Sequence, residues 1–289
     1  MKKALSLAFL CFAAVIVNAQ QGVLFKIKYI PNQLYQTETS STMNMLMNFS
    51  GDTAKVNAVK ASGVKLPMTM IGTSVMHMEV KSGAVKTGNV FPITFKYSDI
   101  KSKQVINDQE KDGPPNPMQG LTIYGGSTID GQIHVDSISG KTLDEQLKTT
   151  ITTAIGNLSK QVKFPETPLH VGETFIQETP INLPVGGINL KFVVKIIYKL
   201  QGISGNQASF DLDQTLTLDL SGQKDDVSLT ASGSGKGSGK MVYDIAKNYP
   251  TSLNSDIDFT FKVLIQDLTM DCTAKISAIN KTTIADLNK

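Results

Sequence analysis

The strongest constraint on the fold is an alternation of apolar and polar residues that recurs through most of the chain. In the clearest case the alternation runs from Leu190 to Leu200 and returns from Ala208 to Leu220, after the turn sequence Ser204-Gly205-Asn206. Successive side chains of a strand point to opposite faces of a sheet, so a period of two predicts long antiparallel strands with one apolar face. The same period covers residues 20–106 and 257–276. We therefore predict a mainly β (α+β) protein whose strands form a curved sheet or half-barrel.

One segment, Thr142–Lys160, departs from this period and predicts a helix. Its apolar residues are spaced by three or four positions and form one stripe, made of Leu143, Leu147, Ile151, Ile155 and Leu158. Thr142 and Glu145 match a capping box, which places the start of the helix at Thr142. A helix stripe and a sheet face each need an apolar partner, so we expect the curved sheet to pack around this central helix.

A glycine-rich stretch, Val227–Tyr243, is predicted to be a strand and not a linker. Its apolar residues and its glycines, including Gly233, Gly235, Gly237 and Gly239, all fall on the same phase of the alternation. Glycines in a strand leave one face without side chains, which lets the sheet bend or lets another element approach closely. We expect this strand to be crossed by the helix or to form the rim of a cavity.

Turn residues divide the remaining alternation into strands. Ser50-Gly51-Asp52 reads as a turn between two strands, and Gln266-Asp267 marks a turn or bulge where the apolar phase flips. Asp130-Gly131 predicts a tight hairpin. Residues Asn107–Gly120 contain three prolines and no apolar period, so we predict an exposed loop there.

The N-terminal residues 1–19 have the pattern of a signal peptide. They contain two lysines, then an apolar run, then a small-residue cleavage site before Gln20. No later run reaches the roughly 18 apolar residues of a membrane span. We predict an exported protein, soluble in the periplasm or outside the cell. The mature chain divides into an N-terminal half (20–161) and a C-terminal half (162–289), which we expect to form one compact unit.

Composition argues against several functions. The chain has no arginine and therefore no bidentate clamp for phosphate or guanine, so we predict no nucleic-acid partner. His77, His134 and His170 show no metal-binding spacing, and no serine lies in a G-x-S-x-G motif. We predict no enzymatic activity, no catalytic residues and no cofactor. Cys11 leaves with the signal peptide, and we expect Cys272 to be a small buried apolar residue.

Methionine is concentrated in one region. Seven of the eleven methionines lie between Met43 and Met78. Thioethers on one sheet face form an adaptable apolar lining, suited to core packing or to a lipid-like ligand. A less favoured alternative is Cu(I), which prefers soft ligands such as Met-x-Met pairs. In that case His77 would point away from Met76 and Met78, so these three could not bind one ion. The predicted ligand-facing residues are Met43, Met45, Met47, Met68, Met70, Gly233, Gly235 and Gly237.

The order of several motifs resembles a family of uncharacterised secreted, β-rich proteins of Bacteroidetes-type bacteria. The motifs are the Met/Thr-alternating first strand, F-x-x-S-x-I, IDGQIHVDSISG, the helix, FPETPLHVGETF and GSGKMVYDIAKNYP. Phe175 stands where that family usually has Trp. The resemblance implies an exported β-rich fold and no catalytic residues. Strands curved around a helix are also similar in architecture to the half-barrel carriers that move lipoproteins through the periplasm.

Two functions are compatible with these features. The first is a non-enzymatic envelope protein that binds a lipid or another hydrophobic molecule in an apolar cavity. The second is a structural or protein-interaction module of the envelope, with a closed core and an outer surface that binds another envelope protein. The first hypothesis requires a concave face that side chains do not fill completely.

Overall fold

The computed structural model describes residues 22–113, 115–158, 162–185, 188–224 and 227–288. The predicted signal peptide, residues 1–19, lies outside the described residues. Among the described residues, no helix has the length and hydropathy needed to cross a membrane.

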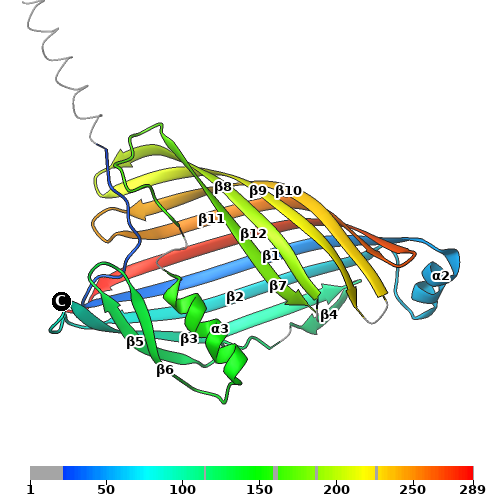
Figure 1. Cartoon of the computed structure of the whole chain (residues 1–289), viewed down its shortest axis with the longest axis horizontal. Coiled ribbons are helices and arrows are strands. Elements are labelled where there is room, and N and C mark those ends of the chain that lie inside the picture. Colours follow the sequence, from blue (N-terminus) through cyan, green and yellow to red (C-terminus); the bar gives the residue numbers. More distant parts are fainter. Residues whose placement is uncertain (1–21, 114, 159–161, 186–187, 225–226, 289) are drawn as a thin grey trace, which may run out of the picture.

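The protein is built on one antiparallel sheet of twelve strands that curves into an open trough (Figure 1). The strand order is β6-β5-β3-β2-β1-β12-β11-β10-β9-β8-β7, and β4 pairs with β3 outside this path. This confirms the predicted fold class. The strands are β1 (Gln33–Gly51), β2 (Met68–Ser82), β3 (Val90–Ile106), β4 (Gln109–Asp112), β5 (Thr122–Thr128), β6 (Ile133–Ser139), β7 (Thr174–Val185), β8 (Ile188–Ser204), β9 (Gln207–Lys224), β10 (Val227–Asp244), β11 (Tyr249–Ile265) and β12 (Leu268–Asp286).

The first and last strands pair at the middle of the sheet. β1 and β12 are in register from Gln33 and Asp286 to Gly51 and Leu268. Strands from before and after the helix therefore belong to one continuous sheet. The predicted turn at Gln266-Asp267 is the β11–β12 hairpin, because Ile265 pairs with Leu268. The predicted hairpin at Asp130-Gly131 joins β5 to β6.

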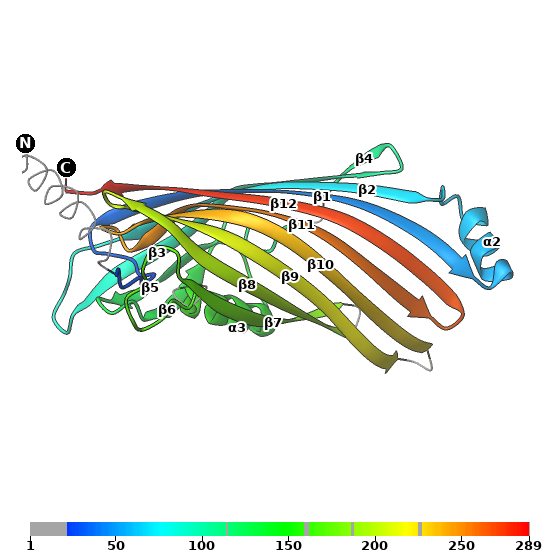
Figure 2. The ribbon, with the colours of Figure 1, turned by 90° about the horizontal axis from the view of Figure 1, so that it is seen from above.

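The predicted helix is present as α3 (Glu145–Gly156), which is shorter than Thr142–Lys160. Its N-cap is Asp144 and not Thr142, because the Asp144 carboxylate accepts a hydrogen bond from the Leu147 backbone N–H at 2.7 Å. Ile151 and Ile155 are buried. The helix lies on the concave side toward one end of the trough, beside β5 and β6 (Figure 2). The sheet therefore curves over α3 at one end only, and the glycine strand β10 is not crossed by it.

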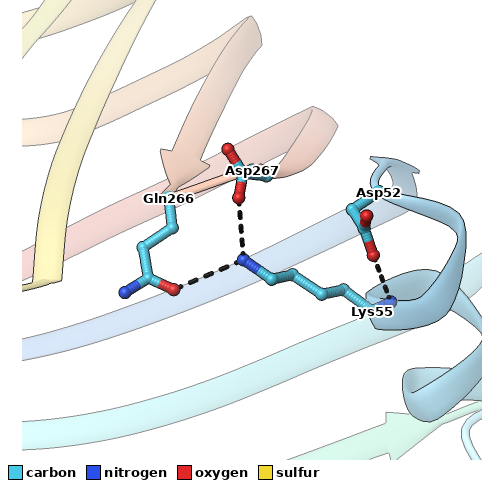
Figure 3. A network of polar contacts seen from close by, with 4 residues as sticks. All are labelled: Asp52, Lys55, Gln266 and Asp267. Atoms are coloured by element: carbon cyan, nitrogen blue, oxygen red, sulfur yellow. Dashed lines mark hydrogen bonds and ion pairs between the residues drawn. The ribbon is translucent and has the colours of Figure 1, made fainter.

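A second helix, α2 (Thr53–Ala61), was not predicted. Its N-cap is Asp52, so the predicted turn at Ser50-Gly51-Asp52 leads into a helix. None of the helix residues is buried, and the helix shows no apolar stripe. The helix is attached to the β11–β12 turn by Lys55, whose Nζ lies 3.1 Å from Asp267 Oδ2 and 3.4 Å from Gln266 Oε1 (Figure 3). It stands at the end of the trough opposite α3.

The prediction of an exposed loop over Asn107–Gly120 was wrong for its first part. Residues Gln109–Asp112 form β4, which pairs with β3 through a two-residue turn. Asn107 and Asp108 both adopt positive φ, 48° and 69°, the backbone conformation of a tight hairpin. The strand was missed because all four of its residues are exposed and polar.

Aromatic and aliphatic side chains fill the end of the trough where β1 begins. One buried cluster lies near α3, and a second lies under the segments that precede β1 and β7. The first includes Tyr29, Tyr35, Phe91, Phe95, Ile151 and Ile155, and the second includes Phe25, Phe164, Phe210 and Tyr243. In the far half of the long strands, toward α2, a third and smaller buried cluster lies on β9 to β12 and comprises Leu218, Leu220, Ala231, Phe259 and Ala274. On β1 and β2 in this half, Met43, Met45, Met68 and Met70 stay half-buried.

Candidate functional site in the far half of the concave face

Strand β1 shows how the concave face changes along the trough. The buried Tyr35 is followed, at every second position, by Thr37, Thr39 and Ser41, and then by Met43, Met45 and Met47. Since alternate residues of a strand share a face, these side chains lie in one line. The line passes from the filled aromatic end, through a polar zone, to an apolar zone.

Strand register extends the apolar zone across the sheet. Each methionine of β1 lies in a row of directly paired residues that runs from β2 to β8, and these rows are named here by their β1 residue. The Met43 row is Gly72, Met43, Ile276, Ile257, Gly237, Gln214 and Ile196. The Met45 row is Met70, Met45, Ala274, Phe259, Gly235, Leu216 and Val194. The Met47 row is Met68, Met47, Cys272, Phe261, Gly233, Leu218 and Phe192. All eight residues predicted to face a ligand therefore occupy three adjacent rows of one face.

The glycines are covered by side chains of neighbouring strands. The rings of Phe192 on β8 and Phe259 on β11 lie 6.4 Å apart, although two strands separate them. Three strand spacings on a flat sheet would be about 14 Å. The strong curvature and the absence of a side chain at Gly235 allow this approach. The glycines therefore shape the trough, and they contribute little surface of their own.

An open groove of about 480 Å³ lies on the methionine side of the same face. Its apolar lining includes Met43, Gly72 and Ile276, and its opposite wall is the loop segment Pro115 to Pro117. Met43, Met45, Met68, Met70 and Ile276 are half-buried, which leaves part of each side chain accessible. The concave face is thus not filled completely, which is the condition that the ligand-binding hypothesis required.

A belt of small polar side chains borders the groove on the side of the aromatic cores. Ser102, Ser74, Ser41 and Ser255 share one row, with Ala278 between the last two. Gln214 and Asn280 lie in the rows on either side. We call these six polar residues the serine belt. Sequence reasoning missed the belt, because its residues come from β1, β2, β3, β9, β11 and β12 and only the strand order brings them together.

Hydrogen bonds connect parts of the belt. Ser41 Oγ and Ser74 Oγ lie 3.4 Å apart, Ser255 Oγ donates to Gln214 Oε1 at 2.9 Å, and Asn280 Nδ2 donates to Thr39 Oγ1 at 3.0 Å. All are neutral groups that both donate and accept. The belt therefore offers hydrogen bonds without charge.

Sulfur atoms also gather in these rows, but in an arrangement that was not predicted. Register places Met68, Met47 and Cys272 side by side, whereas the Cu(I) hypothesis rested on pairs along one strand. Burial, with a smaller contribution from Asp271, raises the pKa of the Cys272 thiol to about 11. A Cu(I) ion would therefore have to displace a tightly held proton. His77 lies on the opposite face of β2, 3.6 Å from Glu38, as the alternation predicts.

Comparisons with known proteins assign no family. No family model matches the sequence, and no curated protein matches it. Among solved structures, lipovitellin, described for its lipid–protein interactions, aligns with a TM-score of 0.46 and 10% identity over 90% of this chain. This chain spans only 26% of that lipovitellin chain.

Two Pseudomonas aeruginosa proteins also align. OccK5 (OpdH) gives a TM-score of 0.24 at 6% identity, covering 86% of this chain and 98% of its own. OccK2 (OpdF) in complex with glucuronate gives 0.28 at 8% identity, covering 88% of this chain and 99% of its own. None of these TM-scores reaches 0.5, so we take neither family nor function from these proteins.

Proposed function

We propose that this protein is an exported, non-enzymatic binding protein that holds a hydrophobic molecule against the far half of its concave face. The observation that carries the proposal is the open groove at Met43, Gly72 and Ile276, beside which Met45, Met68 and Met70 of the neighbouring rows stay half-buried. An apolar ligand placed there would complete their burial, at about 25 cal/mol for each Å² of apolar surface removed from water.

The chemistry of the lining favours a ligand of variable shape. Methionine is unbranched and polarizable, so Met43, Met45 and Met70 can adapt to irregular apolar surfaces. The aromatic side of the trough is more rigid, because Phe259 stacks on Phe261 with ring centroids 5.2 Å apart. One wall thus adapts while the other is fixed, an arrangement that suits acyl chains better than a single rigid ligand.

A structural module with a closed core is the competing function. Such a module would bury its methionines completely and would bind partners with its outer face. The half-buried methionines and the groove support the first function over this one.

The proposal is tested by binding of the apolar fluorescent dye N-phenyl-1-naphthylamine to the mature protein. We expect saturable fluorescence enhancement that Met45→Lys abolishes, because an ammonium group in the apolar rows would be costly to desolvate. Asn44→Lys is the matched control, since Asn44 is the preceding residue and is exposed on the opposite face. Equal dye binding by both variants, with circular dichroism unchanged, would refute the site.

A further inference from the structure

The concave face carries no charged side chain in the apolar rows between β2 and β8. In the rows from Thr39 to Met47, the described side chains on this face of β2, β1, β12, β11, β10, β9 and β8 include no Lys, Asp, Glu or His, whereas Lys111 of β4 pairs with Gln104 of β3 at the end of the Met43 row. Lys103 lines the groove, but its ammonium group forms an ion pair with Glu110 of β4. Charged residues instead occupy the outer face, where Lys275 and Asp258, for example, form an ion pair at 3.8 Å.

The serine belt gives this uncharged face a polar boundary. Ser41 and Ser74 line the same groove as Met43 and Gly72. Asn116 and Gln104 line it as well. A molecule in this groove would therefore meet both hydroxyl and amide groups and the apolar side chains of Met43, Ile100 and Ile276.

From this juxtaposition we propose that the ligand is an uncharged amphiphile, whose hydroxyl or ester group hydrogen-bonds to the serine belt while its acyl chain follows the methionine rows. This inference rests on the proposed function and narrows it to one class of ligand. A neutral hydroxyl or ester exchanges water for Ser and Asn partners at little cost. In the rows between β2 and β8, a carboxylate or ammonium group would lose its hydration without meeting an opposite charge, which is strongly unfavourable.

The position of the serine belt predicts the direction in which the acyl chain of the ligand runs. The polar group lies near Ser41, and each step of two residues along β1 advances about 7 Å toward α2. Met43 and Met45, whose side chains are half-buried, thus provide about 13 Å of accessible apolar wall beyond the belt, and Met47, 6% exposed, is already buried. This length accommodates part of an extended long acyl chain.

The test compares monooleoylglycerol with oleate as competitors of the bound dye, at the same pH and below their critical aggregation concentrations. We expect monooleoylglycerol to compete at least about tenfold more strongly, because only oleate carries a charge into the site. Competition by oleate should strengthen as the pH falls below the pKa of its carboxyl group. Equal competition by both lipids, without pH dependence, would overturn this inference and leave the proposed function intact.

Variants of the belt locate the polar group. Ser41→Lys places an ammonium group beside the predicted head-group position, so the preference should shift toward oleate while dye binding persists. Ser40→Lys, on the opposite face of the same strand, should leave the preference unchanged. If Ser41→Lys keeps the wild-type preference, the head group does not lie at the belt. If neither lipid nor dye binds the wild-type protein, the proposed function itself fails.

Discussion

The glycine strand provides the sharpest test of how this sheet achieves its curvature. A Cβ atom at Gly233 would lie 2.4 Å from Phe261 Cβ, 2.7 Å from the Thr260 carbonyl oxygen and 2.9 Å from Phe261 Cα. All three are backbone or Cβ atoms of β11, so no side-chain rotation can relieve the contact. We therefore predict that Gly233→Ala destabilises the protein, although its φ angle does not require glycine.

The expected size follows from two opposing effects. Overpacking at a site that cannot relax costs about 1–3 kcal/mol. Replacing Gly by Ala also restricts the unfolded chain, which stabilises by about 0.4–1 kcal/mol. The net expectation is a loss of about 1–2 kcal/mol of unfolding free energy. Gly237→Ala should behave alike, because its Cβ would lie 2.4 Å from the Asp256 carbonyl oxygen. Gly235→Ala, whose shortest contact is 2.8 Å, should cost less.

Urea denaturation followed by circular dichroism measures these differences. Ser234→Ala is the control, because Ser234 is exposed on the opposite face of the same strand and the substitution only removes a hydroxyl group from an existing side chain. We expect the control to stay within about 0.5 kcal/mol of the wild type. If Gly233→Ala is as stable as the wild type or more stable, β10 and β11 can move apart to admit the methyl group. The argument that the glycines of β10 are needed for the close approach of β11 would then be wrong.

Three further predictions concern other parts of the fold. Asp144→Ala should lower the unfolding free energy by about 1 kcal/mol through loss of the α3 cap, whereas Thr142→Ala should not, as urea denaturation would reveal. Burial raises the pKa of Tyr97, Tyr198 and Tyr243 from 10.0 to about 12. Because these phenols ionise at a lower pH in the unfolded chain than in the folded protein, their contribution to stability is complete below about pH 10 and declines as the pH rises toward about 12. Absorbance titration tests this, and tyrosinate absorbance of the folded protein at about pH 11 equal to that of the unfolded chain would contradict it. Cys272 is 2% exposed with a raised thiol pKa, so a thiol reagent should label it only after unfolding, and rapid labelling of the native protein would be inconsistent with its position.

Much of the architecture could be predicted from the alternation alone. The period of two identified the long strands and assigned Met45 and Gly235 to apolar faces, since a one-residue slip would move each strand's whole apolar set to solvent. Strand order was not predictable in this way. The pairing of β1 with β12 joins residues more than two hundred positions apart, and it is this pairing that places Met47 beside Cys272 and Ser41 near Ser255.

The elements that were missed have a common physical cause. α2 buries none of its residues, and β4 exposes all of its residues, so neither leaves an apolar period in the sequence. The α3 cap was misplaced by two residues because Thr142 and Asp144 both suit that position, and only the geometry shows which oxygen meets the free N–H. Periodicity reports burial, and it does not detect elements that lie outside the core.

The central claim is that the far half of the concave face holds an uncharged hydrophobic molecule. Native mass spectrometry of the mature protein, purified gently from the envelope fraction of its own cells, tests this claim most directly. We predict a mass excess of lipid size that disappears on denaturation and that Met45→Lys, but not Asn44→Lys, eliminates. A copper-sized excess would instead support the sulfur row of Met68, Met47 and Cys272. A bare mass, together with no uptake of added monooleoylglycerol, would contradict the account.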